Sequence, residues 1–505
     1  MSTTKRPRRT PKKPRPAAIV ARLRARRAAA KKRGVALMLV IGALTVLTVF
    51  LTELQEDTTA ELSAALAERD ALRAEYYARS AINLSRLLIA LEPAVRKAVG
   101  PMASILMGGK KIPQIPVWEF TDLVLGPFND PNASGAFTGA IGPADYSQAK
   151  NLGLSGGGHF ELKIVDEDAK INLNEAAAST PGPEIRLGNR LQGLFAPTTY
   201  DPMFQGRDPD NQFSDRTAIC AAMIDWADYD QNQFSCTPPG PGAAQAPVNN
   251  GAEDNFYQLI GQPYFRKDAP YDSLQELRLV RGVGDDFWNT FVDPDPSDPK
   301  KRVLTVWGQG TVNVNSANAQ TLLAITCAAA PEAPLCIDPN QMESFIMGVT
   351  LAKSFIAGAP LFQSTDDFVK TMQGKGLIGP ILTSLGVQPV LFKSPAEVKK
   401  GINVASKMFS IYADGVVPGY KKTTRIRIHA VVDFRAAGKI SSGQSFGIGG
   451  VTPTMIQNVN NGGAAPTAAN QAASDQANAL AGSPDAYAQV LGKDPAGLVV
   501  YYRVE

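Results

Sequence analysis

The longest run of apolar residues in the chain lies close to its first residues. Val35–Thr52 contains 18 residues without a charged side chain. As a helix this run spans about 27 Å, close to the hydrocarbon thickness of a bilayer. A buried helix in a soluble core is the alternative, but the run is long and its two flanks differ sharply in charge. The pattern therefore predicts a helix that crosses a membrane.

An amphipathic pattern follows the apolar run without interruption. Between residues 72 and 91, apolar or small side chains recur every three or four positions, with charged residues between them. These positions are Leu72, Tyr76, Ser80, Leu84, Leu88 and Leu91. We expect one helix from Val35 to Leu91 that ends before Pro93, because proline breaks a helix interior.

Different patterns mark the last quarter of the chain. Met408–Val416, Thr423–Phe434 and Gly497–Val504 either alternate apolar and polar residues or are rich in β-branched and aromatic residues, which predicts strands. Ala436–Pro495 is rich in Gly, Ala, Asn, Gln and Ser and contains little to bury. This stretch predicts a disordered or loosely packed insertion.

Two segments of the middle region resemble each other. KINLNEA (Lys170–Ala176) and TVNVNSA (Thr311–Ala317) both alternate as a strand and continue into Asn and a helix start. A capping box follows each of them, at Ser273–Glu276 and at Ser364–Asp367. Duplication explains this similarity, and so does chance likeness between short strand-to-helix junctions.

Charge is distributed very unevenly. Residues 1–33 hold 14 of the 51 Lys and Arg residues and no acid, which leaves 37 cations against 47 acids in the remainder. The positive-inside rule places the basic segment in the cytoplasm and the acidic body on the other side of the membrane. A secretory signal peptide is the rival interpretation, but no small-x-small cleavage site follows the apolar run.

A basic leader that ends in glycine directly before an apolar helix resembles the prepilin-type signal of pilins and pseudopilins. The resemblance implies that a prepilin peptidase cuts between Gly34 and Val35 on the cytoplasmic side and methylates the new amine. Pilins and major pseudopilins carry Glu as the fifth residue after the cut, whereas this chain has Leu39. That departure is typical of the K-type minor pseudopilins of type II secretion, and it suits a subunit at the end of a filament.

Further stretches resemble the K-type family and occur in its order. They are IVDEDAKINLNEA, CAAMIDWADYDQNQF, GAEDNFY, PYDSLQELRLVRGVGDDFW and GTVNVNSANAQTLLAI. The resemblance implies an α+β pseudopilin domain with an antiparallel sheet, early strands near Phe160–Asn174, and a large inserted helical part with two SAM-like segments. The implied organisation is leader 1–34, transmembrane helix 35–52, periplasmic amphipathic helix 53–92, first pseudopilin part 93–175, inserted helical regions 176–310 and 311–400, and C-terminal strands 401–505 interrupted at 436–495.

The same resemblance implies a role in assembly. The expected protein is a single-pass inner-membrane protein with a periplasmic body, and it primes a pseudopilus at its tip for the export of folded proteins across the outer membrane. Its expected partners are I- and J-type minor pseudopilins, the prepilin peptidase, the inner-membrane secretion platform and the membrane, without nucleic acid. A type IV pilus minor pilin is the close alternative.

Four cysteines fall in the part assigned to the periplasm, where disulfides persist. They allow three pairings, of which we favour the local one, Cys220–Cys236 and Cys327–Cys336. Free buried thiols are the alternative.

Acidic residues lie between and beyond the first cysteine pair. Asp228, Asp230 and Asn232 alternate as in the first half of a calcium loop, although Gln233 replaces the required Gly. Glu253 and Asp254 follow downstream. From the residues alone, solvated surface charge is the favoured interpretation. K-type pseudopilins bind calcium in this region, so the resemblance implies a Ca²⁺ site here.

Two other functions compete less well. Leu277–Trp288 resembles a helix-hairpin-helix, which would suit a membrane-tethered DNA-binding module for DNA uptake, but only Arg278 and Arg281 lie near its turn. The GQSFG pattern at Gly443–Gly447 fits a nucleophile elbow. However, both histidines, His159 and His429, precede it, whereas the hydrolase order needs one afterwards. We expect no catalysis, and packing roles for the two histidines.

Overall fold

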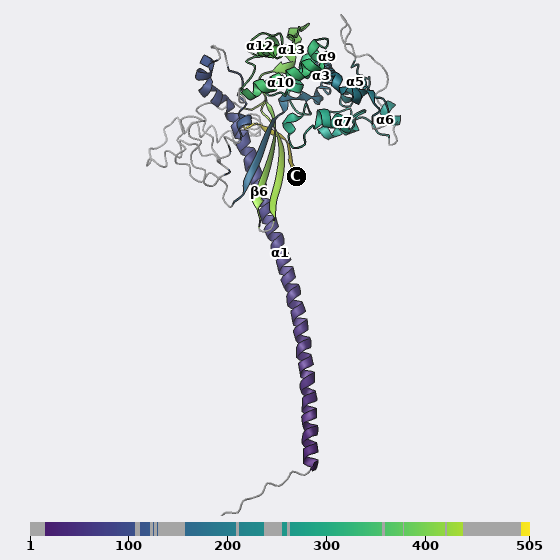
Figure 1. The fold of residues 1–505 in the computed structure, drawn as a ribbon, viewed down its shortest axis with the longest axis vertical. Helices are drawn as coiled ribbons and strands as arrows, with labels where there is room; N and C mark the ends of the chain where they lie inside the picture. The colour runs from purple at the N-terminus through teal and green to yellow at the C-terminus, as the bar shows by residue number, and fades with distance from the viewer. Residues whose placement is uncertain are drawn as a thin grey trace, which may run out of the picture. The chain divides into compact units, whose positions relative to one another are not determined.

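The chain folds as an α+β protein with one long helix, an antiparallel sheet and a large helical insertion, as shown by a computed structural model (Figure 1). The α+β prediction is confirmed. The structure describes residues 16–106, 112–121, 125, 129, 157–208, 212–236, 255–259, 263–355, 359–376, 378–419, 422–437 and 496–505.

Helix α1 runs from Pro16 to Leu106. Its part up to Leu72 forms a compact unit of its own, and Arg73 to Glu505 form a second unit. Among the described residues, only the helical stretch Val35–Lys97 is long and apolar enough to cross a membrane, with a mean hydropathy of 2.6 over its most apolar window. None of that window is buried against other residues.

The prediction that this helix ends before Pro93 is wrong. Helix α1 continues through Pro93 to Leu106, and residues just before the proline make tertiary contacts. Ala90 is buried in the core of the sheet. The buried carboxylate of Glu92 accepts a hydrogen bond from the Ile115 amide at 2.9 Å and pairs with Arg96. These contacts outweigh the hydrogen bond that proline cannot donate.

The sheet has the strand order β1-β6-β7-β8, and every neighbouring pair is antiparallel. Its strands are β1 (His159–Asp166), β6 (Met408–Pro418), β7 (Thr423–Asp433) and β8 (Leu498–Val504). The predicted early and late strands are thereby confirmed. One face of the sheet packs on α1, with Ala78, Ile82, Phe409, Ile411 and Ala430 in a common apolar core.

The helices α3 to α13 lie between β1 and β6 in the sequence, and Figure 1 shows them gathered at one end of the sheet. They are α3 (Pro181–Phe195), α4 (Asp201–Gln205), α5 (Arg216–Asp225), α6 (Asn255–Leu259), α7 (Asp285–Phe287), α8 (Ala319–Ala329), α9 (Pro334–Ile337), α10 (Pro339–Phe355), α11 (Thr365–Met372), α12 (Gly379–Ser384) and α13 (Pro395–Gly401). They bury two apolar cores, one chiefly from residues 171–306 and one chiefly from residues 312–402. Their SAM-like character stays a prediction.

The two similar sequence segments also have the same local structure. In the first, β2 (Ile171–Asn172) pairs in parallel with β3 (Leu304–Thr305), and the Asn174 side chain hydrogen-bonds both the amide and the carbonyl of Tyr271. In the second, β4 (Val312–Asn313) pairs in parallel with β5 (Ile402–Asn403). There the Asn315 side chain binds the amide and the carbonyl of Phe362 in the same way. Each bridged residue stands two positions before a capping serine, Ser273 or Ser364. This shared geometry favours duplication over chance.

Three consecutive acids at the end of β1 connect the sheet to the inserted helices. Asp168 accepts hydrogen bonds from the backbone amides of Gln309, Lys407 and Met408 at 2.9, 2.6 and 3.1 Å. Asp166 accepts one from the Ser406 hydroxyl. Glu167 pairs with the buried Lys170 at 3.1 Å and accepts a hydrogen bond from the Thr305 hydroxyl.

Burial and the neighbouring charge of Asp168 raise the pKa of Asp166 to about 7, and burial raises the pKa of Asp168 to about 6. Because Asp166 keeps its proton in the folded state at pH values where the unfolded chain has lost it, the free energy of unfolding falls as pH rises from about 4 to about 7.

We predict that Asp166→Asn reduces the slope of this pH dependence, because the amide has no proton to lose. Denaturant unfolding of the full chain in detergent and EDTA, followed by tryptophan fluorescence between pH 4 and 8, measures it. Asp286→Asn makes the same change of charge at an exposed position and should keep the wild-type slope. Equal slopes for all three proteins would contradict the prediction.

Gly415 leads to a second prediction, because the backbone of α1 lies directly against this residue of β6. A Cβ atom at this position would lie 1.8 Å from the carbonyl oxygen of Ala74. Gly415→Ala must therefore push the strand away from the helix and should lower the free energy of unfolding by about 1–3 kcal/mol.

Gly182→Ala is the control, since its nearest neighbour would be a flexible Arg186 nitrogen at 3.6 Å. It should change stability by no more than about 0.5 kcal/mol. Equal effects of the two substitutions, measured by denaturant unfolding, would count against the close approach.

Candidate functional site

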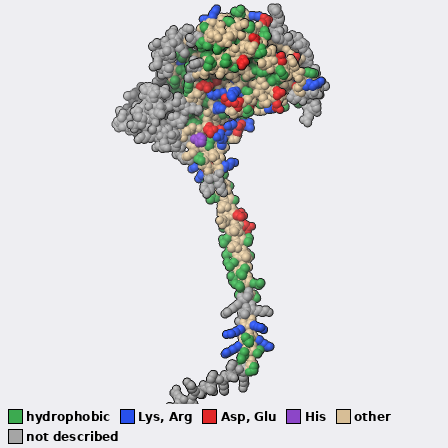
Figure 2. Space-filling model, in the orientation of Figure 1, with side chains coloured by type: hydrophobic (Ala, Val, Ile, Leu, Met, Phe, Trp, Pro, Cys, Tyr) green, Lys and Arg blue, Asp and Glu red, His purple; other side chains and the backbone are tan. Residues whose placement is uncertain are grey.

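The residues at the predicted cut lie within α1. Gly34 and Val35 are both helical, and the side chains of Val35 and Leu39 are 59% and 69% exposed. Figure 2 shows apolar side chains along this part of the helix, with Lys and Arg before them and acidic side chains after them. Leu39 therefore lies on an exposed, apolar surface of the helix, which can contact lipid or another helix.

Both predicted disulfides are present. Cys220 and Cys236 are joined, as are Cys327 and Cys336, with Cα–Cα distances of 6.0 and 5.5 Å. The first bond ties α5 to the end of the acidic loop that follows this helix. The second ties α8 to α9.

Arg266 organises the acidic loop from a distant part of the sequence. Its guanidinium donates to the carbonyl oxygens of Asp225 and Asp230 at 2.9 and 2.6 Å and to a carboxylate oxygen of Asp228 at 3.3 Å. It also pairs with Asp268 at 3.0 Å. The arginine side chain is 1% exposed, so the loop is built around a buried positive charge.

The acids around this loop nevertheless keep their protons more tightly than usual. Burial raises the pKa of Asp225 to about 8. Burial and the charge of Asp230 raise the pKa of Asp228 and of Glu184 to about 7. The second carboxylate oxygen of Asp228 is buried without a hydrogen-bond partner. One arginine therefore does not neutralise this group of acids, and a further cation would fit its chemistry.

The structure brings together part of the predicted calcium site. Asp228 is buried within the loop, while Asp230 and Asn232 are exposed and connected by a hydrogen bond from the Asn232 amide to the Asp230 carboxylate. Glu253 and Asp254 lie outside the described residues. Within the described ranges, no three His, Cys, Asp or Glu side chains group closely enough to hold a metal ion. These positions leave the calcium site as a hypothesis.

Sequence reasoning missed three members of this cluster. Asp225 stands in one of the stretches that resemble the family, and an acid at the end of an otherwise apolar helix could have been noticed. Glu184 and Arg266 are far from the loop in sequence and carry no local pattern, so only the fold reveals them.

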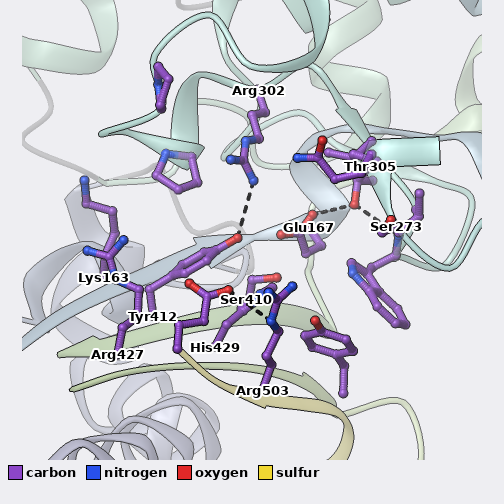
Figure 3. A pocket seen from close by; sticks show the side chains of 18 of the residues that line it. Lys163, Glu167, Ser273, Arg302, Thr305, Ser410, Tyr412, Arg427, His429 and Arg503 are labelled. Carbon is purple, nitrogen blue, oxygen red and sulfur yellow. Dashed lines mark hydrogen bonds and ion pairs between the residues drawn. The ribbon is translucent and has the colours of Figure 1, made fainter. Parts of the chain in front are cut away.

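A polar cleft of about 510 Å³ lies between the open face of the sheet and the inserted helical part (Figure 3). Most of its charged side chains are already paired, as in Arg427 with Asp414 at 2.7 Å and Arg302 with Asp293 at 2.9 Å. On its floor, the ring of His429 stacks on Tyr412 with a centroid distance of 4.2 Å. Burial lowers the pKa of His429 to about 4, so the ring is neutral at pH 7. The expected packing role of His429 agrees with this geometry.

The helix-hairpin-helix resemblance does not provide a phosphate site. Arg278 pairs with Asp285 at 3.0 Å and lies over the ring of Trp288. Arg281 donates to the Ser214 hydroxyl and the Phe213 carbonyl. Both cations near the turn are thus used within the protein. The GQSFG pattern at Gly443–Gly447 lies outside the described residues.

Comparisons with known proteins relate this chain to type II secretion. No family model matches the chain. Over 227 residues the sequence is 26% identical to type II secretion system protein K of Pseudomonas aeruginosa, a match that covers 44% of this chain. The match covers 52% of that protein, so the chain spans about half the length of this curated relative.

A solved structure is also similar. The crystal structure of the GspK-GspI-GspJ complex from the type 2 secretion system of enterotoxigenic Escherichia coli contains a chain that matches 75% of this chain and 94% of its own length. The identity is 14% and the TM-score 0.39. The sequence match to protein K confirms the resemblance predicted from the leader and the ordered stretches: this chain is similar to the K-type proteins of type II secretion.

Proposed function

We propose that the chain is a minor pseudopilin of a type II secretion system that stands at the tip of the pseudopilus. The observation that carries the proposal is the 227-residue match to protein K, combined with the basic leader, Gly34 and the apolar helix in one continuous order. The function is assembly of a filament tip that helps to export folded proteins across the outer membrane.

Membrane anchoring supplies the first step of the proposed mechanism. The cations before Gly34 keep the leader in the cytoplasm, and the acidic body lies in the periplasm. A prepilin peptidase in the inner membrane cuts after Gly34 and leaves Val35 with a free amine, which it methylates. The shortened helix then stays in the bilayer, next to the secretion platform, until it is extracted into a filament.

Leu39 supports a place at the filament end. A carboxylate at this position of a pilin pairs with the amine of a neighbouring subunit, because an unpaired charge in hydrocarbon is costly. Leucine offers no such partner to a subunit above it. The helix of this chain therefore packs beside those of I- and J-type minor pseudopilins and does not bind a further subunit above it.

Calcium is the second part of the proposal. The charges of Asp228, Asp230 and Glu184 interact with one another, although these three side chains are not grouped closely enough to hold a metal ion by themselves, and Asp228 has a buried oxygen without a partner. Hard oxygen donors of this kind suit Ca²⁺, which needs six to eight of them. Asn232, Glu253 and Asp254 would contribute further oxygens. The ion would hold the disulfide-closed loop in one conformation.

The cut after Gly34 is tested by Gly34→Ala. The variant should retain its leader and lose most of its co-purification with other minor pseudopilins from membranes, because the peptidase requires the glycine. Intact-mass measurement and co-purification provide the readouts. Gly42→Ala is the matched control, because no atom lies within 4 Å of a Cβ placed there; it should be cut and assembled normally. Normal processing of the Gly34→Ala protein would refute the proposed cut.

The calcium site is tested by thermal unfolding of the full chain. Calcium at 100 times its Kd should stabilise the fold by about 2.7 kcal/mol, and EDTA should remove that gain. Asp228→Asn should reduce the gain strongly, whereas Asp286→Asn, at an exposed position, should preserve it. A wild-type melting temperature that is the same in calcium and in EDTA would rule the site out.

A further inference from the structure

The last strand of the sheet has one side without a partner strand among the described residues. In the order β1-β6-β7-β8, β8 is paired only with β7. Glu505 and Arg427 exchange both of their backbone hydrogen bonds, which fixes the alternation along the pair. The amides and carbonyls of Val504 and Tyr502 therefore point away from β7, toward the open edge.

This edge carries apolar side chains. Leu498, Val500, Tyr502 and Val504 are 53, 40, 45 and 46% exposed. Native sheets usually protect an edge strand with Lys, Pro, a bulge or a cover, since an apolar edge with free amides pairs with other strands. A bulge interrupts the pairing with β7 near Val500, but Tyr501 to Val504 pair regularly. Most of the edge is thus suited to pairing.

The opposite edge of the sheet differs in this respect. On β1, the side-chain amide of Asn129 donates to the Phe160 carbonyl at 2.7 Å, and its oxygen accepts from the Phe160 amide at 2.9 Å. A side chain of the protein itself thus occupies backbone groups on that edge. Arg86 likewise donates to the carbonyls of Ala496 and Gly497, directly before β8. Farther along β8 the outward backbone groups of Tyr502 and Val504 have no such contact with a described side chain.

The surroundings of β8 indicate where a partner would come from. Tyr502 lies on the face of the sheet that packs on α1, and it hydrogen-bonds Arg79 of that helix. The neighbouring Tyr76 is 62% exposed. A subunit that packs beside the part of α1 that contains Tyr76 and Arg79 would consequently meet this edge of the sheet as well.

We propose that the open edge of β8 binds an extended strand from the periplasmic domain of a neighbouring minor pseudopilin. This inference rests on the proposed function. The incoming strand supplies amides and carbonyls to Val504 and Tyr502, and it places apolar side chains next to theirs on the α1 face. Backbone pairing gives the affinity, and the apolar row fixes the register.

The test uses the full chain, expressed with the other minor pseudopilins in cells. Val504→Pro removes an amide that points outward and leaves the hydrogen bonds to β7 intact, which an edge strand tolerates. It should lower the recovery of the partner subunit about tenfold, which corresponds to the loss of one good hydrogen bond. Val504→Thr keeps the amide and the β-branched shape, and it should bind normally.

Val504→Lys provides a second variant that retains the backbone and places a charge on the edge, and it should weaken recovery similarly. Unchanged melting temperatures show that the variants are folded. A photoreactive phenylalanine analogue at Tyr502 should crosslink to another minor pseudopilin. Crosslinks only to residues 438–495 of the same chain, or only to a second copy, would overturn the proposal, as would normal recovery of the partner by Val504→Pro and Val504→Lys.

The two proposals fail in different ways. If the wild-type chain recovers no other minor pseudopilin, the proposed function fails and the strand pairing fails with it. If recovery through the membrane helices persists in both edge variants and the Tyr502 crosslink to a partner is absent, only the strand pairing is wrong.

Discussion

The buried acids at the end of β1 are the constraint on which the body of this protein depends. The chain leaves the sheet after Asp166 and returns 240 residues later at Ser406, whose hydroxyl donates to that same carboxylate. Loop-closure entropy grows only slowly with length, so an insertion of this size costs little by itself. The difficulty is to place it in one orientation, and the hydrogen bonds of Asp166, Glu167 and Asp168 to both parts provide that orientation.

The charges of these acids make the stability of the fold depend on pH, and their hydrogen bonds specify how the inserted part is oriented on the sheet. Adjacent carboxylates in a buried position repel one another, and the raised pKa of Asp166 reflects that repulsion together with desolvation. Lys170 compensates Glu167, while Asp168 is stabilised chiefly by backbone amides from Gln309, Lys407 and Met408. Apolar packing alone would bury the same surface, but it would specify the geometry between sheet and insertion less precisely.

Local pattern was enough to predict the main elements. The apolar run, the strands around Met408 and Thr423, and the serine caps follow from periodicity and side-chain chemistry within a few residues. Helix α1 passes Pro93 because Glu92 and Ala90 make contacts that no local rule includes. The sequence predicted part of the acidic cluster, from Asp228 to Asn232. Glu184 and Arg266 reach it only through tertiary folding. The similar segments near Asn174 and Asn315 were visible as sequences, but the shared role of these asparagines, each bridging a distant backbone, required the structure.

In the proposed assembly, the apolar helix and the open edge of β8 each provide a contact to a neighbouring subunit at the side, and neither provides one to a subunit above. A filament grows when each subunit offers complementary groups to the one before it and the one after it. In the proposed assembly, Leu39 removes one such group from the helix. Leucine carries no energetic penalty within lipid, whereas an unpaired carboxylate there would cost about 2.5–3.5 kcal/mol. The described part of the body in turn uses many of its charged side chains in internal pairs, as Arg278 with Asp285 and Arg427 with Asp414 show. The apolar helix surface and the backbone of β8 at its open edge both recognise shape and hydrogen-bonding geometry without requiring a charge. Such surfaces suit a permanent place beside a few fixed neighbours.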